Sequence, residues 1–322
     1  MSELSNGGIC LVSGMWTFFG TATLAAAALT LMGFLARLWW IFDLAGHFRV
    51  QYLAILLACG VAYSLNEQTG MATFATLFAL VNFFVLLRLY IRPGAGDGQG
   101  QAYRVLLANV LQKNPSSTQL TALIQEKKPD FIFLVEPNQR WLDELQLIQP
   151  DYPYWAAAPR QDNYGLALIS RIPIEKHEIR TFVPKGVPSV IAELQLDGSR
   201  MTLIATHPPP PKSAALTRMR NRQMEELARF ASAQDGEVIV CGDLNMTPWT
   251  PPFLRVLKIS RLRDSTRGFG LQPTWPVNNL LFRVPIDHCL HSKGLRVVNR
   301  SVGKAFGSDH FPLIIDFHFT GE

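Results

Sequence analysis

The tetrapeptide GDLN at residues 242–245 directly follows the apolar run VIVC at residues 238–241, and this junction decides the fold. A short branched apolar run that ends in Gly and Asp is typical of a buried strand. Functional polar residues gather where a rigid strand passes into a loop. Asp243 alone is equally well explained as a turn residue, because Asp-Leu-Asn after Gly is also turn chemistry. Whether Asp243 is a functional residue or a turn residue depends on which residues follow the other predicted strands.

Further short apolar runs of strand length occur at 103–108, 131–135, 166–170, 190–196, 201–206 and 313–319. Helical patterns with an apolar face lie between some of them, at 117–127 and 215–231. Strands and helices in this order predict an α+β or α/β sandwich.

Polar residues follow these runs repeatedly. The residues at or just after the runs include Asn109, Glu136, His207, Asp243 and Asn245. Two segments near the C-terminus add Asp287, in PIDH (285–288), and Asp309 and His310, in GSDHFP (307–312). One acid or histidine in such a place is most often a helix cap, an ion-pair partner or a structural group. The recurrence predicts a functional site.

The order and the sequences of these segments resemble the motifs of the endonuclease/exonuclease/phosphatase superfamily. Its fold is shared by pancreatic-type DNases, AP endonucleases, inositol polyphosphate phosphatases and bacterial sphingomyelinases. The matching segments are the strand ending at Asn109, FLVEP (133–137), ALISR (167–171), ATHPPP (205–210), GDLN (242–245), PIDH (285–288) and GSDHFP (307–312). They cover residues 103–316. The resemblance implies an α+β four-layer β-sandwich flanked by helices (DNase-like) over residues 102–322. HFRVQYL (47–53) and TWP (274–276) resemble a membrane-attached bacterial branch of it.

The resemblance also implies a divalent-metal site. Mg²⁺ or Mn²⁺ would neutralise charge on the phosphoryl oxygens and on the leaving group. Glu136 is the implied principal ligand, Asn109 a neutral oxygen ligand, and Asp309 would complete the site directly or through water.

The remaining implied roles concern water and phosphate. Asp243 would orient or deprotonate the attacking water, and Asn245 would donate a hydrogen bond to a phosphoryl oxygen. Residues two apart on an extended segment point the same way, so one loop could present both. His310 would contact the phosphate with its tautomer fixed by Asp287, and His207 would be a second donor.

Two departures argue against abasic-site repair. AP endonucleases usually have an acid two residues after the first Asn, where this chain has Leu111, and they lack a histidine at the position of His207. Among weaker candidates, a solvated helix face explains Arg220 and Arg222 better than phosphate contact does. Trp275 fits a lipid or base pocket and ordinary packing equally well.

Residues 1–92 differ from the rest in composition, since they carry four Arg, no Lys and three acids. They predict a transmembrane region of about three helices, at 11–36, 50–65 and 71–91. The second run is short, and only the segment at 39–48 could extend it. A Gly-rich linker follows at 93–101 and marks the boundary of the catalytic domain. A buried helical hairpin of a soluble protein is the disfavoured alternative.

The distribution of Arg predicts the sidedness of a multi-pass cell-membrane protein. Arg37, Arg49, Arg88 and Arg92 lie on one side if there are three crossings, which places the catalytic domain in the cytoplasm. The conclusion changes if the second run is re-entrant.

Three functions follow as hypotheses. The first is a membrane-anchored phosphoesterase acting on a lipid-linked or membrane-proximal phosphate, because the anchor confines the site to the bilayer. The second is a membrane-tethered nuclease, although the catalytic part carries 26 basic and 22 acidic residues, a mild excess without a basic stripe. The third is a non-catalytic binding module. The four cysteines show no metal-site spacing, and no obligate protein partner is evident.

Overall fold

The protein is represented by a computed structural model that describes residues 3–92 and 101–320, with side chains from residue 14 onward. The residues form two compact units, one of residues 1–88 with 249–251 and the other of residues 89–248 with 252–322. The predicted linker at 93–101 lies outside the described residues apart from Gln101.

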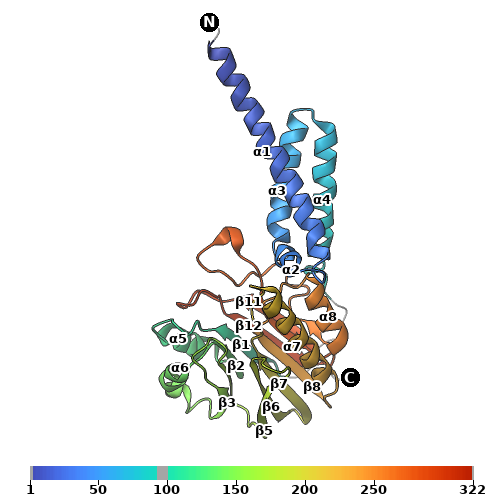
Figure 1. The fold of residues 1–322 in the computed structure, drawn as a ribbon. Helices are drawn as coiled ribbons and strands as arrows, with labels where there is room; N and C mark the ends of the chain where they lie inside the picture. The colour runs from blue at the N-terminus through green and yellow to red at the C-terminus, as the bar shows by residue number, and fades with distance from the viewer. Residues whose placement is uncertain (1–2, 93–100, 321–322) are drawn as a thin grey trace. The chain divides into compact units, whose positions relative to one another are not determined.

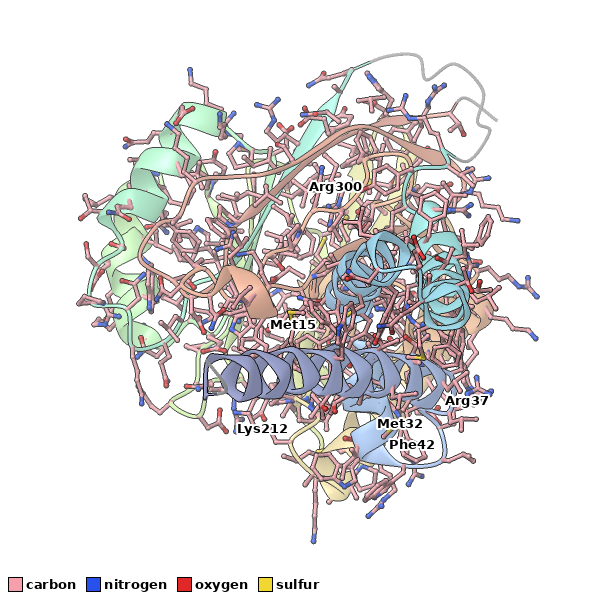
Figure 2. The ribbon with its side chains drawn as sticks, turned by 90° about the horizontal axis from the view of Figure 1, so that it is seen from above. Met15, Met32, Arg37, Phe42, Lys212 and Arg300 are labelled. Atoms are coloured by element: carbon pink, nitrogen blue, oxygen red, sulfur yellow. The ribbon has the colours of Figure 1, made fainter. Side chains whose placement is uncertain are left out.

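The first unit is helical. It contains α1 (Glu3–Phe34), α2 (Trp40–Gly46), α3 (Arg49–Leu65) and α4 (Thr69–Leu87). α3 and α4 lie side by side, and Met15 and Met32 mark the course of α1 (Figures 1 and 2). Small and apolar side chains such as Ala26, Leu56 and Ala79 pack between these helices. Small residues at helix contacts allow the close approach that is usual in membrane bundles.

Two of these helices, at Gly14–Phe34 and Thr69–Leu87, are long and apolar enough to cross a membrane. α2 and α3 together would make a third span, but they meet at a bend of 64°. The bend falls in the segment that the sequence required to lengthen the short second run.

A polar chain of hydrogen bonds joins the helices of the first unit. Arg49 Nη1 donates to Asn82 Oδ1 over 3.2 Å, and Asn82 Nδ2 donates to Thr30 Oγ1 over 2.8 Å. All three side chains are buried. Since buried polar groups are costly in an apolar environment unless they are paired, this chain links α3, α4 and α1 specifically.

The second unit is built on two mixed six-stranded sheets. The first has the order β11-β12-β1-β2-β4-β3, from β1 (Tyr103–Asn109), β2 (Phe131–Val135), β3 (Tyr154–Ala158), β4 (Leu166–Ser170), β11 (Leu295–Val302) and β12 (Leu313–Phe319). The second has the order β5-β6-β7-β8-β10-β9, from β5 (Lys176–Thr181), β6 (Pro188–Leu196), β7 (Ser199–Thr206), β8 (Glu237–Asp243), β9 (Arg263–Asp264) and β10 (Asp287–His291).

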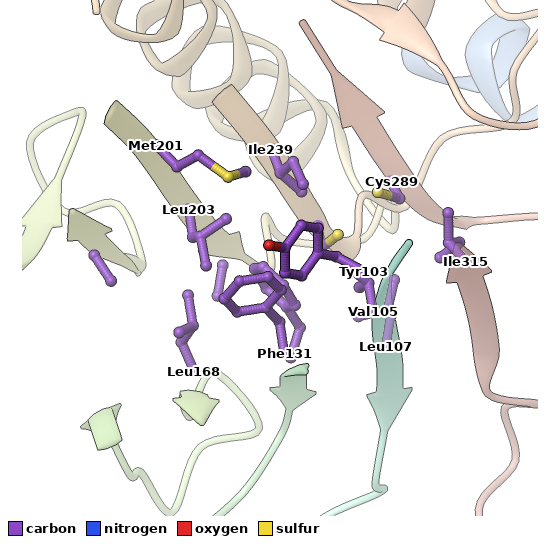
Figure 3. Close-up of a cluster of buried hydrophobic side chains, with 14 of the residues drawn as sticks. Tyr103, Val105, Leu107, Phe131, Leu168, Met201, Leu203, Ile239, Cys289 and Ile315 are labelled. Carbon is purple, nitrogen blue, oxygen red and sulfur yellow. The ribbon is translucent and has the colours of Figure 1, made fainter. Parts of the chain in front are cut away.

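The sheets pack face to face, and helices cover their outer faces. Alternate residues of β1 divide between two cores: Val105 and Leu107 join the core between the sheets (Figure 3), whereas Leu106 packs beneath the helices. A strand segment buried on both faces must be apolar, which explains the apolar run from Val105 to Ala108. The outer helices are α5 (Thr118–Lys127), α6 (Gln139–Glu144), η1 (Leu145–Ile148), α7 (Ala214–Ser232) and α8 (Pro251–Ser260). The predicted four-layer α+β sandwich is confirmed.

Each sheet contains one parallel pair connected through a helix. β1 and β2 are joined through α5, and β7 and β8 through α7. The carboxyl ends of two parallel strands lie at the same edge of a sheet, where ligands of open α/β sheets bind. The topology therefore collects four of the predicted polar strand ends at one edge of the sandwich.

An ion pair between β1 and β12 gives a pH-dependent contribution to stability. Arg104 Nε and Nη2 donate to the two carboxylate oxygens of Asp316 over 2.7 and 2.9 Å. Burial alone would raise the pKa of Asp316, but the hydrogen bonds from Arg104 and Asn299 and the charge of Arg104 lower it. A lowered carboxyl pKa stabilises the fold above about pH 4, and this contribution is lost as the pH falls through the folded pKa.

We expect Asp316→Asn to lower the free energy of unfolding at pH 7 by about 1–2 kcal/mol, a modest figure because Arg104 is partly exposed. The difference from wild type should shrink below about pH 4, where the wild-type carboxylate is itself becoming protonated. Thermal unfolding of both proteins at pH 7 and pH 3.5 measures it. A difference that stays constant between the two pH values would show that the charge of Asp316 contributes nothing.

Candidate active site

The strand register sets the positions of the predicted residues. Asn109 ends β1 beside Val135, so it lies next to Glu136. In the second sheet β10 runs antiparallel to β8 and places Asp287 directly opposite Asp243. β12 begins opposite the end of β1, where Leu107 pairs with Leu313, so the segment before β12 reaches the same edge. That segment carries Asp309 and His310.

Asp243 lies at the centre of the group. Its Oδ2 is 3.3 Å from Asn109 Nδ2, 3.6 Å from His207 Nε2 and 3.6 Å from His310 Nε2. The Asn109 amide nitrogen also lies 3.2 Å from Glu136 Oε1. One carboxylate oxygen thus faces side chains from both sheets, and the structure brings the predicted residues together around it.

Asp287 and His310 form a buried pair. His310 Nδ1 donates to Asp287 Oδ2 over 2.8 Å, which leaves Nε2 directed at Asp243. Burial alone would lower the pKa of His310, but the charge and hydrogen bond of Asp287 and the charge of Asp243 raise it to about 10. The same pairing lowers the pKa of Asp287 against the effect of burial. The ring is therefore a cation at neutral pH, with a polarised N–H at Nε2.

His207 is held in the opposite state. Its Nδ1 lies 3.0 Å from the carbonyl oxygen of Asn163, so that nitrogen carries the proton. Burial and the positive charge of His310 lower the pKa of His207 to about 4, and its ring packs against Tyr164. In this neutral form Nε2 is an acceptor. To act as a hydrogen-bond donor to phosphate, as predicted, His207 must gain a second proton at Nε2. The negative charge of an approaching phosphate would favour this protonation.

Asn245 is positioned by a turn. Its φ is 52°, and its backbone N–H donates to Asp243 Oδ1 over 3.0 Å. The premise of an extended segment from Asp243 to Asn245 was wrong, because β8 ends at Asp243 and the chain enters a left-handed conformation. Asn245 Nδ2 donates to the carbonyl oxygen of Pro208 over 3.0 Å, which orients the amide beside the His207 segment.

Arg220 supports this turn from α7. Its side chain is fully buried, and its Nη1 donates to the carbonyl oxygen of Asn245 over 2.7 Å. The prediction of a solvated helix face was therefore wrong for Arg220, while Arg222 is exposed. The sequence held no signal for this, because an arginine on an amphipathic helix gives no indication that it is buried.

Two glycines permit close backbone approach at the site. A Cβ on Gly242 would lie 1.8 Å from the carbonyl oxygen of Thr206, and one on Gly165 would lie 1.9 Å from that of Pro137. Gly242 precedes Asp243 and Thr206 precedes His207, so the first contact sets the spacing of these two residues. Gly165 accepts a hydrogen bond from the backbone of Glu136, whose φ of 66° directs the chain out of β2.

The carboxylates of the site have the electrostatics of a cation site. Burial raises the pKa of Asp243 to about 8, with the charges of Asp287 and Glu136 adding to the shift against that of His310. Burial also raises the pKa of Glu136, and the charge of Asp309 adds to it. Crowded, buried carboxylates are stabilised by a hard divalent cation, so the residues present fit such an ion.

Two sets of residues could hold the ion. Asp243, Asp287 and His310 offer ligand atoms that all lie within 4.8 Å of one another. His310 is a poor ligand, however, because one ring nitrogen is bound to Asp287 and the raised pKa keeps the other protonated. Glu136 is half-buried and accepts hydrogen bonds from two neutral donors, the Asn109 amide and the Gln112 N–H, which makes it the better primary ligand.

Asp309 and Trp275 form part of the wall of the site. Trp275 Nε1 donates to Asp309 Oδ2 over 3.0 Å, and the Trp275 ring lies 6.3 Å from the His310 ring. Trp275 thus orients a predicted ligand. Sequence reasoning left the position open between pocket lining and packing, because only the fold brings the TWP segment beside the SDH segment.

Comparisons with known proteins agree with this geometry. The family model described as "Endonuclease/Exonuclease/phosphatase family" matches residues 97–310. None of the curated proteins matches the chain significantly.

Similar solved structures include TDP2 from D. rerio with a single-strand DNA product, at 17% identity and a TM-score of 0.58 over 68% of this chain and 100% of that one. Truncated TDP2 from Caenorhabditis elegans has 21% identity and a TM-score of 0.56 over 68% and 98%. The human Nocturnin catalytic domain with bound sulfate has 18% identity and a TM-score of 0.54 over 69% and 96%. At these identities the likeness shows a shared fold. With the family match over most of the second unit, the chain belongs to the Endonuclease/Exonuclease/phosphatase family, whose chemistry is the hydrolysis of phosphate esters.

Proposed function

We propose that the chain is a membrane-anchored, divalent-metal-dependent phosphoesterase that hydrolyses a lipid-linked or membrane-proximal phosphate by in-line attack of an activated water. The observation that carries the catalytic half is the buried Asp243 carboxylate. It lies within 3.6 Å of two histidine nitrogens held in opposite protonation states. A site that needs both proton acceptance and charge stabilisation uses groups whose environments separate their pKa values.

Mg²⁺ or Mn²⁺ would be held by Glu136, with Asn109 and Asp309 as further oxygen donors. When bound, the ion supplies charge neutralisation for the phosphoryl and leaving oxygens. Asn109 would first have to turn its Oδ1 toward the ion, because that atom accepts a hydrogen bond from the Leu111 N–H over 3.1 Å. Leu111 stands where AP endonucleases usually have an acid, and its contribution is the backbone N–H that donates to Asn109 Oδ1.

The side chains of the protein provide the other functions. Asp243 accepts a proton from the attacking water, and burial places its pKa of about 8 close to neutrality, where a general base works best. His310, charged and fixed by Asp287, donates from Nε2 to a phosphoryl oxygen. Asn245 donates with the amide hydrogen that is not bound to Pro208. His207 contacts the same phosphoryl group once it gains a proton.

The membrane half of the proposal is supported by composition and length. Two helices of the first unit can cross a bilayer, and α2 with α3 would make a third span. A tether of this kind raises the local concentration of lipid phosphates at the site. We place the protein in the cell membrane as a multi-pass protein with its catalytic domain in the cytoplasm, on the distribution of arginines in the sequence.

A substrate panel tests the proposal. Detergent-solubilised full-length protein is given polyprenyl phosphate, phospholipid, sphingomyelin or supercoiled plasmid, with Mg²⁺, Mn²⁺ or EDTA. We expect turnover of a lipid phosphate that EDTA abolishes and added Mg²⁺ or Mn²⁺ restores, because without the ion nothing neutralises the charge on the phosphoryl and leaving oxygens next to Glu136 and Asp309. Plasmid cleavage far above any lipid turnover would identify a nuclease instead. Activity that survives EDTA and dialysis would contradict the metal site.

A further inference from the structure

The loop at 276–283 exposes three consecutive large apolar side chains. It carries the short helix η2 (Leu280–Phe282), where Leu280, Leu281 and Phe282 are 75%, 76% and 55% exposed. The loop projects from the catalytic unit in orange in Figure 1. We call these three residues the apolar tip. Within the described part of the second unit, other strongly exposed large apolar side chains lie singly, as Leu147 does, or directly after α4.

The loop is closed at its base. Trp275 and Val284 form an isolated antiparallel bridge. Arg283 donates from Nε to the Pro276 carbonyl oxygen over 3.0 Å and also binds the Val277 carbonyl oxygen. The Arg283 guanidinium lies 4.9 Å above the centre of the Phe311 ring. These contacts hold the loop as a fixed projection, so the exposure of the tip is built into the fold.

The base of the loop is also a wall of the active site. Val277 N–H donates to the Asp309 carbonyl oxygen over 2.8 Å, and Trp275 Nε1 donates to the Asp309 side chain. Phe311, the residue after His310, donates its N–H to the Thr274 carbonyl oxygen over 2.9 Å. Val277, which contacts the SDH segment (308–310), lies three residues before the tip in the sequence. Whatever surface the tip touches is therefore held beside the site.

The chemistry of the tip favours lipid over nucleic acid or water. Two of its three side chains are aliphatic, so Phe282 is its single ring on which a base could stack, and the loop contains no lysine to follow a nucleic-acid backbone. No acid lies between Thr274 and Ile286, and the one charged residue there is Arg283, so anionic headgroups would not be repelled. Contiguous exposed apolar side chains usually mark an interaction surface. The same chain carries two helices that are long and apolar enough to cross a bilayer, so a lipid surface is the partner that the proposed function supplies.

We infer that the apolar tip enters the hydrocarbon boundary of the bilayer and holds the active site at the level of the lipid headgroups. The inference rests on the proposed lipid-directed function and deepens it. The tip would work as an interfacial anchor for the catalytic unit, additional to the transmembrane helices, and would select phosphates embedded in a membrane over the same esters in solution.

A depth measurement tests the contact without using activity. A fluorescent NBD label is placed at Leu280→Cys or, as the control, at Leu147→Cys, which is 79% exposed. Both variants carry Cys10→Ala, and the cysteines at 59, 241 and 289 are buried. In nanodiscs of phosphatidylglycerol and phosphatidylcholine, doxyl-labelled lipid should quench the Leu280 label several-fold more than the Leu147 label. Equal quenching of the two labels would overturn the inference.

A turnover ratio tests the consequence. Full-length protein in nanodiscs is assayed on polyprenyl phosphate and on soluble bis-p-nitrophenyl phosphate. The double variant Leu280→Ser/Leu281→Ser should lower the ratio of lipid to soluble turnover by about tenfold or more, since each leucine buried is worth more than a factor of ten in binding. Leu147→Ser should leave the ratio within about twofold. Loss of both activities in proportion would show that the tip serves only internal packing and would overturn the inference.

The two proposals fail in different ways. If the Leu280 label is quenched by lipid but wild-type protein hydrolyses only the soluble ester or plasmid, the membrane contact stands and the lipid substrate is wrong. If lipid phosphate is hydrolysed but the Leu280 label is not quenched, the substrate stands and the apolar tip is not an anchor.

Discussion

Asp243→Asn is expected to lower the rate of phosphate ester hydrolysis by about 10³-fold, because an amide cannot accept the proton of the attacking water. The carboxylate oxygen that faces Asn109, His207 and His310 is the most central atom of the site. The substitution keeps the shape of the side chain. Turnover of bis-p-nitrophenyl phosphate with Mg²⁺ measures the loss.

Stability provides the control for this substitution. The raised pKa of Asp243 means that the buried carboxylate is less stable than its protonated form. A neutral asparagine should therefore keep or raise the unfolding temperature in EDTA while activity falls. Asp235→Asn, in an exposed acid after α7, should behave like wild type. Activity of Asp243→Asn within about tenfold of wild type would exclude Asp243 as the base.

Asp287→Asn is expected to lower the rate by about 10²-fold or more without Asp287 touching the substrate. Asp287 fixes His310 through the 2.8 Å bond to Nδ1 and supplies the charge that keeps the ring a cation. An asparagine removes that charge and can present its NH₂ to Nδ1, which would favour the other tautomer. Asp287 is thus a positioning residue for His310.

A double-mutant cycle separates this role from a general structural one. If Asp287 acts through His310, Asp287→Asn/His310→Gln should be no slower than His310→Gln alone, because residues that act as a unit are not additive. The rates of the four proteins on the soluble ester give the coupling. Effects that multiply in the double variant would show that Asp287 contributes independently of His310.

Much of the fold was predictable because most central strands are buried on both faces. β1, β2, β7 and β8 each contain a mainly apolar run followed by a polar residue, and the sequence located each of them. β5 was not predictable, since Lys176–Thr181 forms a largely exposed strand at the sheet edge without an apolar run. β11 was missed for a related reason: it is also an edge strand, and its register shifts between Val297 and Asn299.

The composition of the site was more predictable than its orientation. The strand ends identified the acids, histidines and amides that the structure brings together. The direction of each side chain depends on the local backbone conformation, which could not be inferred from the residue types. Examples are the left-handed φ values at Asn245 and Glu136. Arg220 and Trp275 were assigned too little weight because their partners, Asn245 and Asp309, are distant in the sequence.

The division of the site between the two sheets has a dynamic consequence. Asn109 and Glu136 extend from the first sheet, whereas His207 and Asp243 extend from the second, and the densely packed core of Figure 3 lies between them. Such an interior behaves as a solid and does not flex like a hinge. The two halves of the catalytic unit therefore cannot open and close around the substrate as lobes do. Entry of the substrate and departure of the product must therefore depend on the loops around the site, and not on relative movement of the two sheets.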